Sequence, residues 1–161
     1  KSVFHADHNN IGTGGPITPA SLDEARQLLA KQKDVGGHDY LDIMAELLLV
    51  PVSLRGTALQ TVTSTGDPTS GNANSRKANI ALNLVDPENI VDTARLSGTR
   101  WYLFANPAEH AVLEVAFLNG ERNPQIEQED YFNSAGMKYR VMHDWGVAGV
   151  GYRGAVTNAG A

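Results

Sequence analysis

Cysteine is absent from this sequence of 161 residues. Its absence excludes disulfide bonds, zinc sites built on thiolates and a thiol nucleophile, and it fits a chain made in a reducing compartment. No run of apolar residues approaches the roughly 18 that a membrane-spanning helix needs. The first residues also lack the basic and then apolar pattern of a signal peptide.

Positive charge is in short supply as well. Lys and Arg together number 13 against 18 Asp and Glu, which gives a net charge of -5. Proteins that wrap nucleic acid usually carry a clustered basic surface, and this balance argues against one. Apolar residues make up 42% and charged residues 19% of the chain, which is typical of a globular protein. The length suits one domain with a core of its own.

The stretch from Ser21 to Lys33 predicts an amphipathic helix. Ser21 and Glu24 fit a capping box, with Ser21 as the residue that caps the first turn. Lys31 and Lys33 suit the last turn, where positive charge is favourable. The apolar stripe at helical spacing consists of Leu22, Ala25, Leu28 and Leu29.

Three further elements follow before the middle of the chain. The run from Ala45 to Val52 is continuously apolar and too short for a helix, so it predicts a buried strand that is stopped by Pro51. Residues 54–62 predict a second short helix with Ser53 as its cap. Residues 65–77 hold no large apolar side chain and predict a long exposed loop.

The second half of the chain predicts strands. Its short runs are rich in β-branched and aromatic residues: ENIVDTARL, RWYLFANP, VLEVAFLNG, PQIEQED, MKYRVMHDW and GVAGVGYRGAV. The glycines of the last run predict one bent or bulged strand; they are Gly146, Gly149, Gly151 and Gly154. Two or three helices beside a mostly antiparallel sheet predict an α+β domain.

The opening His5-Ala6-Asp7-His8 is the first candidate for chemistry. His5 and His8 are three residues apart, a spacing that could hold one metal ion on a helix. The glycines that follow make a helix improbable, and a third ligand would have to come from elsewhere in the chain, with three candidates: His38, His110 and His143. A structural turn is the favoured interpretation, because Asp7 and Asn9 are good turn formers. If a metal site exists, zinc should co-purify and His5→Ala should remove it.

Other candidate motifs are weaker. GTGGP, residues 12–16, lacks the Gly-Lys-Ser/Thr ending of a phosphate loop, and no G-x-S-x-G elbow exists. Glu127 and Glu129 should share one solvated face of a strand, where charge prevents unwanted pairing. His143 and Asp144 are strand neighbours that would point to opposite faces. We therefore expect no catalytic, cofactor-binding or metal-ligating residue, and no cofactor.

An ordered set of stretches resembles a known family. FHADHNN, the helix SLDEARQLLAKQK and ELLLVPVSL before ALQTV come first, followed by WYLFANP, LEVAFLNG, PQIEQEDYF and GMKYRVMHDWGVAGVGYRGAVTN. Together they resemble the major capsid proteins of tailed phages, of the Mu-like type that is sometimes fused to a prohead protease. In that pattern FHADHNN is a structural segment.

The resemblance implies the Hong Kong 97-type coat fold. An axial-type domain would span about residues 20–120, and residues 1–19 and 121–161 would form peripheral-type segments. The N-terminal arm, the extended loop and the long spine helix of the family have no counterpart here. The chain is therefore expected to be a C-terminal portion of a coat protein.

The implied function is structural. The chain would be a non-enzymatic head subunit that forms pentamers and hexamers in an icosahedral shell, with a scaffold or prohead protease as possible partner. It would touch packaged DNA without reading its sequence, bind no membrane, and pass from the host cytoplasm to the virion head. Two alternatives stay open: a metal-dependent hydrolase that uses His5, Asp7, His8 and His143, and a ring-forming head-completion or tail protein.

Overall fold

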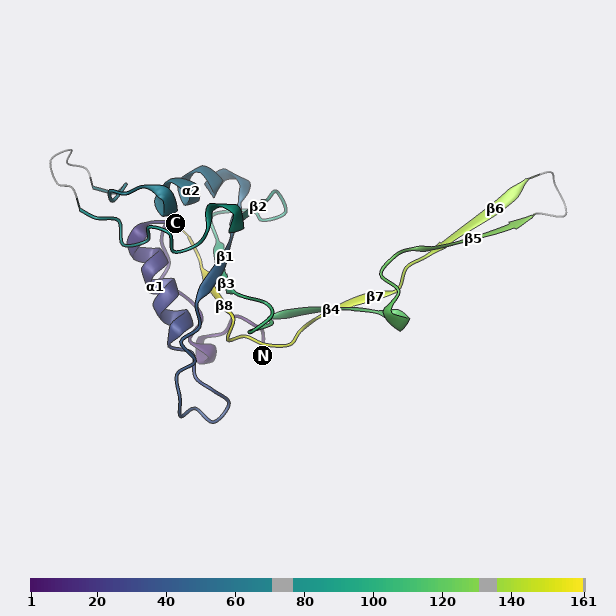
Figure 1. The fold of residues 1–161 in the computed structure, drawn as a ribbon, viewed down its shortest axis with the longest axis horizontal. Coiled ribbons are helices and arrows are strands. Elements are labelled where there is room, and N and C mark those ends of the chain that lie inside the picture. Colours follow the sequence, from purple (N-terminus) through teal and green to yellow (C-terminus); the bar gives the residue numbers. More distant parts are fainter. Residues whose placement is uncertain (71–76, 131–135, 161) are drawn as a thin grey trace. The chain divides into compact units, whose positions relative to one another are not determined.

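The computed structural model describes residues 1–70, 77–130 and 136–160, and the chain divides into two compact units (Figure 1). The first unit contains Lys1–Val112 and Gly151–Ala161. The second unit is one continuous stretch, Leu113–Val150. Among the described residues, no helix is both long and apolar enough to cross a membrane.

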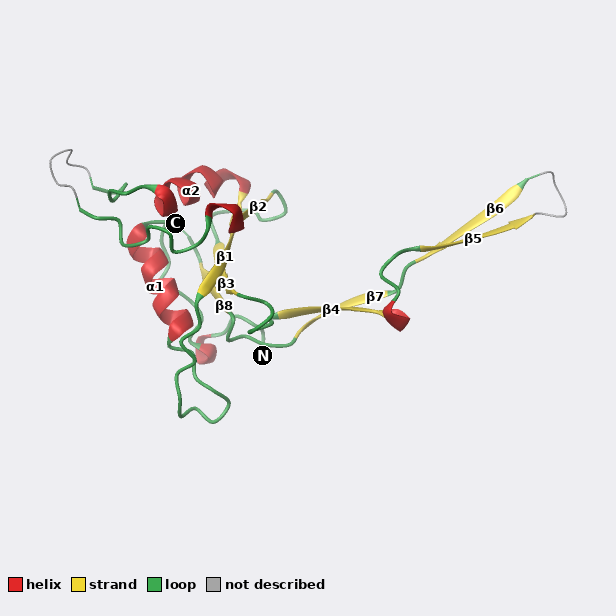
Figure 2. Ribbon diagram, viewed as in Figure 1, coloured by secondary structure: helices red, strands yellow, loops and turns green. Residues whose placement is uncertain are grey.

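The first unit is built on a four-stranded sheet with the order β2-β1-β3-β8 (Figure 2). The β1–β2 pair is parallel, whereas β1–β3 and β3–β8 are antiparallel. The strands are β1 (Ala45–Pro51), β2 (Ile90–Thr93), β3 (Trp101–Ala105) and β8 (Ala155–Asn158). The helices are α1 (Pro19–Ala30) and α2 (Arg55–Thr63), with 3-10 turns at Ala6–His8, Val52–Leu54 and Pro87–Asn89.

The apolar run at residues 45–51 became the inner strand β1, as its composition predicted. Leu48 pairs with Ile90 of β2 on one side and with Leu103 of β3 on the other. A strand paired on both edges lies inside the sheet, where β-branched and leucine side chains bury well. The predicted α+β class with a mostly antiparallel sheet is confirmed.

The core of the first unit lies between this sheet and the two helices. Helix α1 contacts β3 and β8, and α2 contacts β1 and β2. The stripe predicted for α1 is confirmed, because Leu22, Ala25 and Leu29 are buried and Leu28 packs against them. The largest apolar side chains that are completely buried are Trp101, Leu22, Leu29, Leu48, Leu103 and Val50.

The start of α1 differs from the sequence prediction. Thr18 is the N-cap residue: the backbone N–H of Ser21 donates to Thr18 Oγ1 at 3.1 Å, and the N–H of Thr18 donates to Ser21 Oγ at 3.0 Å. Pro19 occupies the first helical turn, where its missing N–H costs nothing. The capping box predicted for Ser21 and Glu24 is wrong, because the Glu24 carboxylate accepts hydrogen bonds from Thr13. The helix ends at Ala30, with Lys31 as its C-cap.

Helix α2 also lacks its predicted cap. Ser53 lies in a 3-10 turn, and Leu54 precedes the helix without any side-chain hydrogen bond.

We expect Thr18→Ala to lower the free energy of unfolding by about 1 kcal/mol, a typical loss for a helix cap. Ser53→Ala should change it by less than about 0.5 kcal/mol, as for an ordinary surface site. Urea unfolding followed by circular dichroism measures the loss for each variant. Equal losses would contradict the assignment of Thr18, and not Ser53, as a helix cap.

The predicted exposed loop at residues 65–77 lies partly outside the described residues. Its described ends are joined, since Gly66 bridges Ala78 and the N–H of Asp67 donates to the carbonyl oxygen of Lys77 at 3.0 Å. Asp67 also accepts from the N–H and hydroxyl of Thr69, and these bonds hold the pKa of its carboxyl below the usual value. Stabilisation from this turn is therefore present above the ordinary Asp pKa and is lost as the pH falls below it.

The glycine-rich run at residues 146–156 is two strands, and the prediction of one bent strand is wrong. Strand β7 (Trp145–Gly149) belongs to the second unit, and β8 belongs to the first. Gly151 and Gly154 lie between them. A Cβ at either position would overlap a backbone carbonyl oxygen, of Ala111 and His110 respectively. These two glycines are therefore required by close backbone packing.

The second unit consists of two separate two-stranded ribbons. Strand β4 (Leu113–Phe117) pairs with β7, and β5 (Gln125–Asp130) pairs with β6 (Met137–Met142), both antiparallel. A 3-10 turn at Leu118–Gly120 follows β4. The predicted strands of the second half are thus present, although they are distributed over three sheets.

Candidate functional site

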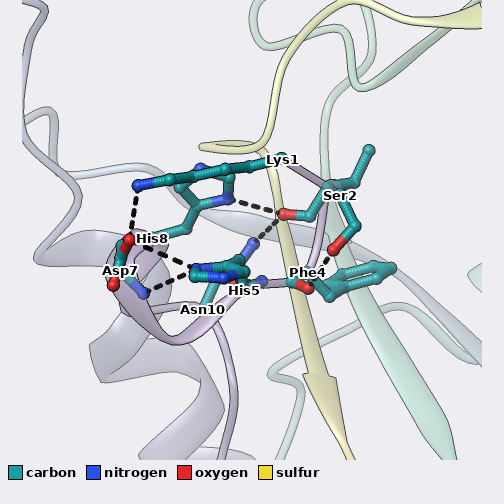
Figure 3. A network of polar contacts seen from close by, with 8 residues as sticks. Lys1, Ser2, Phe4, His5, Asp7, His8 and Asn10 are labelled. Atoms are coloured by element: carbon teal, nitrogen blue, oxygen red, sulfur yellow. Dashed lines mark hydrogen bonds and ion pairs between the residues drawn. The ribbon is translucent and has the colours of Figure 1, made fainter.

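The opening histidine cluster forms a tight turn. The side chain of His5 accepts from the N–H of Asp7 at 3.2 Å, and Asp7 forms an ion pair with Lys1 (Figure 3). His8 Nδ1 lies 3.0 Å from the carbonyl oxygen of Val3. The hydrogen bond and charge of Lys1 hold the pKa of the Asp7 carboxyl below its usual value. Nδ1 of His5, Nδ1 of His8 and the Asp7 carboxylate therefore all have partners within residues 1–8.

In the part of the chain that the structure describes, no third ligand joins this cluster. Within residues 1–70, 77–130 and 136–160, no three His, Asp or Glu side chains are placed to hold a metal ion. The N–H of His38 donates to Asp34 in the turn after α1, and His143 belongs to the second unit. His8 stacks on Tyr152 with the ring centroids 3.9 Å apart. Such packing suits a structural segment.

The first residues are anchored to the sheet by backbone and amide hydrogen bonds. Buried Asn10 donates from Nδ2 to the carbonyl oxygen of Val3 at 2.9 Å (Figure 3). The same Nδ2 also donates to the carbonyl oxygen of Tyr152 at 3.3 Å. The N–H of Gly12 donates to Thr157 and the N–H of Thr157 donates to Asn10, so residues 10–12 extend the edge of β8. This edge is therefore covered, which removes one template for unwanted pairing.

The remaining motifs also show no catalytic arrangement. In GTGGP, Gly15 donates to the carbonyl oxygen of Gly160, which ties the segment to the end of the chain. His143 and Asp144 lie in the turn between β6 and β7, where the His143 ring is 5.9 Å from that of Phe117. The carbonyl oxygen of Asp144 accepts from the N–H of Leu118. Neither motif brings a nucleophile and a base together.

The β4–β7 ribbon has two chemically different faces. Its register places Phe117 opposite Trp145, and Val115 opposite Val147. Because directly opposed residues share a face and neighbours along a strand alternate, these four side chains and Leu113 form one face. We call these five residues the apolar face. The opposite face carries Glu114, Ala116, Gly146 and Ala148.

The β5–β6 ribbon is divided in the same way. Glu127 pairs with Arg140 and Glu129 with Lys138, and Arg140 Nε lies 3.5 Å from Glu127 Oε2. The predicted common, solvated face of Glu127 and Glu129 is confirmed. The other side of this ribbon presents four exposed apolar side chains: Ile126, Met137, Tyr139 and Val141.

No residue of the second unit is buried among the residues 113–130 and 136–150 that the structure describes. A two-stranded ribbon without a packed face is marginally stable in water. Contiguous exposed apolar surface on a folded chain commonly marks a site of protein association. The second unit is therefore the candidate functional site of this molecule, and the chemistry it offers is burial against another surface.

The sequence analysis did not identify this surface. The signal was present, because large apolar residues alternate with small or charged residues in LEVAF and WGVAG with the period of a strand. The period alone places the large residues on one side of each strand. The pairing of β4 with β7 was needed to show that the two large sides coincide.

A family model described as phage capsid protein matches residues 2–158. No curated protein and no solved structure matches the chain.

Proposed function

Because the chain belongs to the phage capsid protein family, we propose that it is a major head-shell subunit of a tailed phage or prophage. Its role is structural, as a component of the virion head. In the proposal, many copies assemble into pentamers and hexamers of an icosahedral shell that encloses DNA. Each contact can be weak, because many contacts acting together make a stable shell.

The observation that carries this proposal is the second unit without a core. Most of its large apolar side chains are exposed, and the secondary structure of residues 113–130 and 136–150 consists of two-stranded ribbons and one 3-10 turn. An isolated chain gains little from folding such a unit, whereas a neighbouring subunit would bury it and stabilise both. A subunit that completes its fold through its neighbours is what a self-assembling shell requires.

The finer assignments belong to the same proposal. We assign the chain to the Hong Kong 97-type coat fold of the Mu-like group, with residues of about 20–120 in an axial-type domain. Residues 1–19 and 121–161 would be peripheral-type segments. The α+β sheet of the first unit and its two helices are consistent with this assignment. We further propose assembly in the host cytoplasm, with a scaffold or prohead protease as assisting partner.

Contact with the packaged DNA is proposed to be non-specific. The net charge of -5 disfavours tight binding to a polyanion. A container that holds its cargo loosely can release it, so mild acidity suits the inner face of a shell. We propose no catalytic role, since no observation favours the hydrolase alternative.

Assembly is tested on the purified chain over a range of concentrations. Light scattering behind a sizing column gives the mass, and negative-stain electron microscopy gives the form of each peak. We expect a mass well above the 17.3 kDa of one chain, with rings or closed particles. Rings of one fixed size without shells would favour the head-completion or tail alternative. A monomer at every concentration and in shell-promoting salts would contradict the proposal.

A further inference from the structure

We propose that Asn119 is a site of spontaneous deamidation, and that its conversion to an acid opens the turn that follows β4. In this reaction the backbone nitrogen of Gly120 attacks the side-chain Cγ of Asn119 and closes a five-membered succinimide ring. The amide nitrogen of the side chain leaves as ammonia and takes the proton of the Gly120 N–H with it. Water then opens the ring at either carbonyl and leaves aspartate or isoaspartate. The reaction uses only water and base, so this inference does not depend on the proposed function.

Asn119 is the only asparagine of the sequence that is followed by glycine. Glycine has no Cβ that would hinder the approach of its own nitrogen to the Asn119 side chain. A Cβ built at Gly120 would meet no described atom within 4 Å beyond its chain neighbours, so other segments leave this nitrogen accessible. Both residues are exposed. Water and base therefore reach the two reacting atoms directly.

The two residues form the corner of a tight turn. Asn119 has φ 54° and ψ 17°, and Gly120 has φ 76°. The N–H of Glu121 donates to the carbonyl oxygen of Leu118 at 3.1 Å. Positive φ at both central residues is the pattern of a type I′ turn, for which Asn-Gly is a preferred pair. A planar succinimide ring needs a ψ of Asn119 well away from the value in this turn, so the turn must open before the reaction.

Opening of this turn costs little free energy, because the surrounding unit has no packed interior. None of residues 113–130 and 136–150 is buried. Besides the bond from Glu121 to Leu118, the turn is held by a hydrogen bond from the N–H of Leu118 to the carbonyl oxygen of Asp144 at 3.1 Å. Segments with few buried contacts and exposed hydrogen bonds open locally at low cost. Once the turn is open, the attack is intramolecular, which favours ring closure.

Both products weaken the turn that the asparagine formed. Isoaspartate carries the main chain through the former side chain, which adds one carbon to the backbone between Leu118 and Glu121. The dihedral angles of the type I′ turn cannot be kept with this longer backbone. Either product also adds a negative charge. Asn119 lines a cavity of about 70 Å³ together with Glu121 and Asp144, so two carboxylates would repel the new one there.

Asn83 provides a matched control inside the same chain. It is exposed and also has a positive φ, of 56°. The residue after it is Leu84, whose N–H donates to the carbonyl oxygen of Ala81 at 3.2 Å and whose side chain packs against the core of the first unit. The nitrogen that would attack Asn83 is therefore occupied, and its segment is held in place.

Peptide mass spectrometry measures deamidation at both positions in one sample. The 161-residue chain is incubated at neutral and at mildly alkaline pH, and chromatography separates the aspartate and isoaspartate forms of each peptide. We expect Asn119 to be converted at least about ten times faster than Asn83, since its turn opens more readily. The rate should rise with pH, because the Gly120 nitrogen must lose its proton to attack. Equal rates at the two positions, or no conversion of Asn119 at alkaline pH, would overturn the assignment.

Amide hydrogen exchange tests the effect on the turn. Exchange of the Glu121 N–H is compared before and after conversion and in Asn119→Asp, with Asn83→Asp as the control for added charge. We expect exchange to become at least about ten-fold faster after conversion, less so in Asn119→Asp, which lacks the extra backbone carbon, and to stay unchanged in Asn83→Asp. Unchanged exchange after conversion would show that the turn survives, and the second half of the inference would be wrong. Neither result bears on assembly, so a failure here leaves the proposed function as it stands.

Discussion

Replacing Trp101 with alanine should lower the free energy of unfolding of the first unit by about 3–5 kcal/mol. Trp101 opens β3, is completely buried and is the largest side chain of the core. Its removal leaves a cavity that the inner strands of a four-stranded sheet cannot close by small movements. Since domains of this size are stable by about 5–15 kcal/mol, the alanine variant should lose between about a fifth and nearly all of its stability.

Trp101→Phe is the informative control. The indole Nε1–H of Trp101 is buried and has no hydrogen-bond partner among the described residues. A buried unsatisfied donor costs about 1–3 kcal/mol, and phenylalanine removes that cost while it keeps most of the ring. We expect Trp101→Phe to remain within about 1.5 kcal/mol of the parent chain. Urea unfolding followed by far-ultraviolet circular dichroism compares the variants. A phenylalanine variant as unstable as the alanine variant would contradict this expectation.

Replacing Gly154 with alanine should destabilise the first unit by about 3 kcal/mol, the upper end of typical overpacking losses. The added Cβ would overlap the carbonyl oxygen of His110 and lie 3.0 Å from the His110 Cβ. The clash is with backbone, so no rotamer change relieves it. The carbonyl oxygen of Gly154 also accepts from the N–H of Ala105 at 2.9 Å, which fixes the segment against β3.

Gly56→Ala is the matched control for this prediction. Gly56 lies in α2 of the same unit, and a Cβ added there meets open space. Alanine in a helix is favoured over glycine by roughly 0.5–1 kcal/mol, so the control should be equal to the parent or slightly more stable. For a chain of this length, 3 kcal/mol corresponds to a fall in Tm of roughly 6–12 °C. Equal melting temperatures for the Gly154 variant and the parent would show that the backbone yields at this site.

The two predicted helix caps show where local sequence rules stop. Ser21 with Glu24 and Thr18 with Ser21 both satisfy the residue types of a cap. The structure uses Thr18 because Pro19 begins the helix, and because Glu24 accepts two hydrogen bonds from Thr13. The Glu24 carboxylate could accept hydrogen bonds either from the first turn of its own helix or from Thr13. The position of the loop that carries Thr13 decides between the two. The local pattern does not contain that information.

The glycines near the end of the chain give a second case. Four glycines in eleven residues predicted an irregular strand, and irregular backbone is present. Their actual role depends on the partner backbone: Gly151 and Gly154 are required by the chain segment at residues 110–111, whereas a Cβ at Gly146 would meet nothing. Spacing along a strand cannot distinguish a glycine that admits a neighbour from one that does not.

The sequence by itself determined most of the elements, the α+β class, the buried stripe of α1 and the inner strand β1, because hydrophobic period is a local property. Its ordered stretches also pointed to the capsid family, to which the chain belongs. Only the tertiary structure decided that residues 113–150 form a separate unit, with no buried residue among those that the structure describes, and that the large side chains of β4 and β7 share one face. The reason is physical: which sides of two strands coincide depends on their register, and register is a relation between distant segments of the chain.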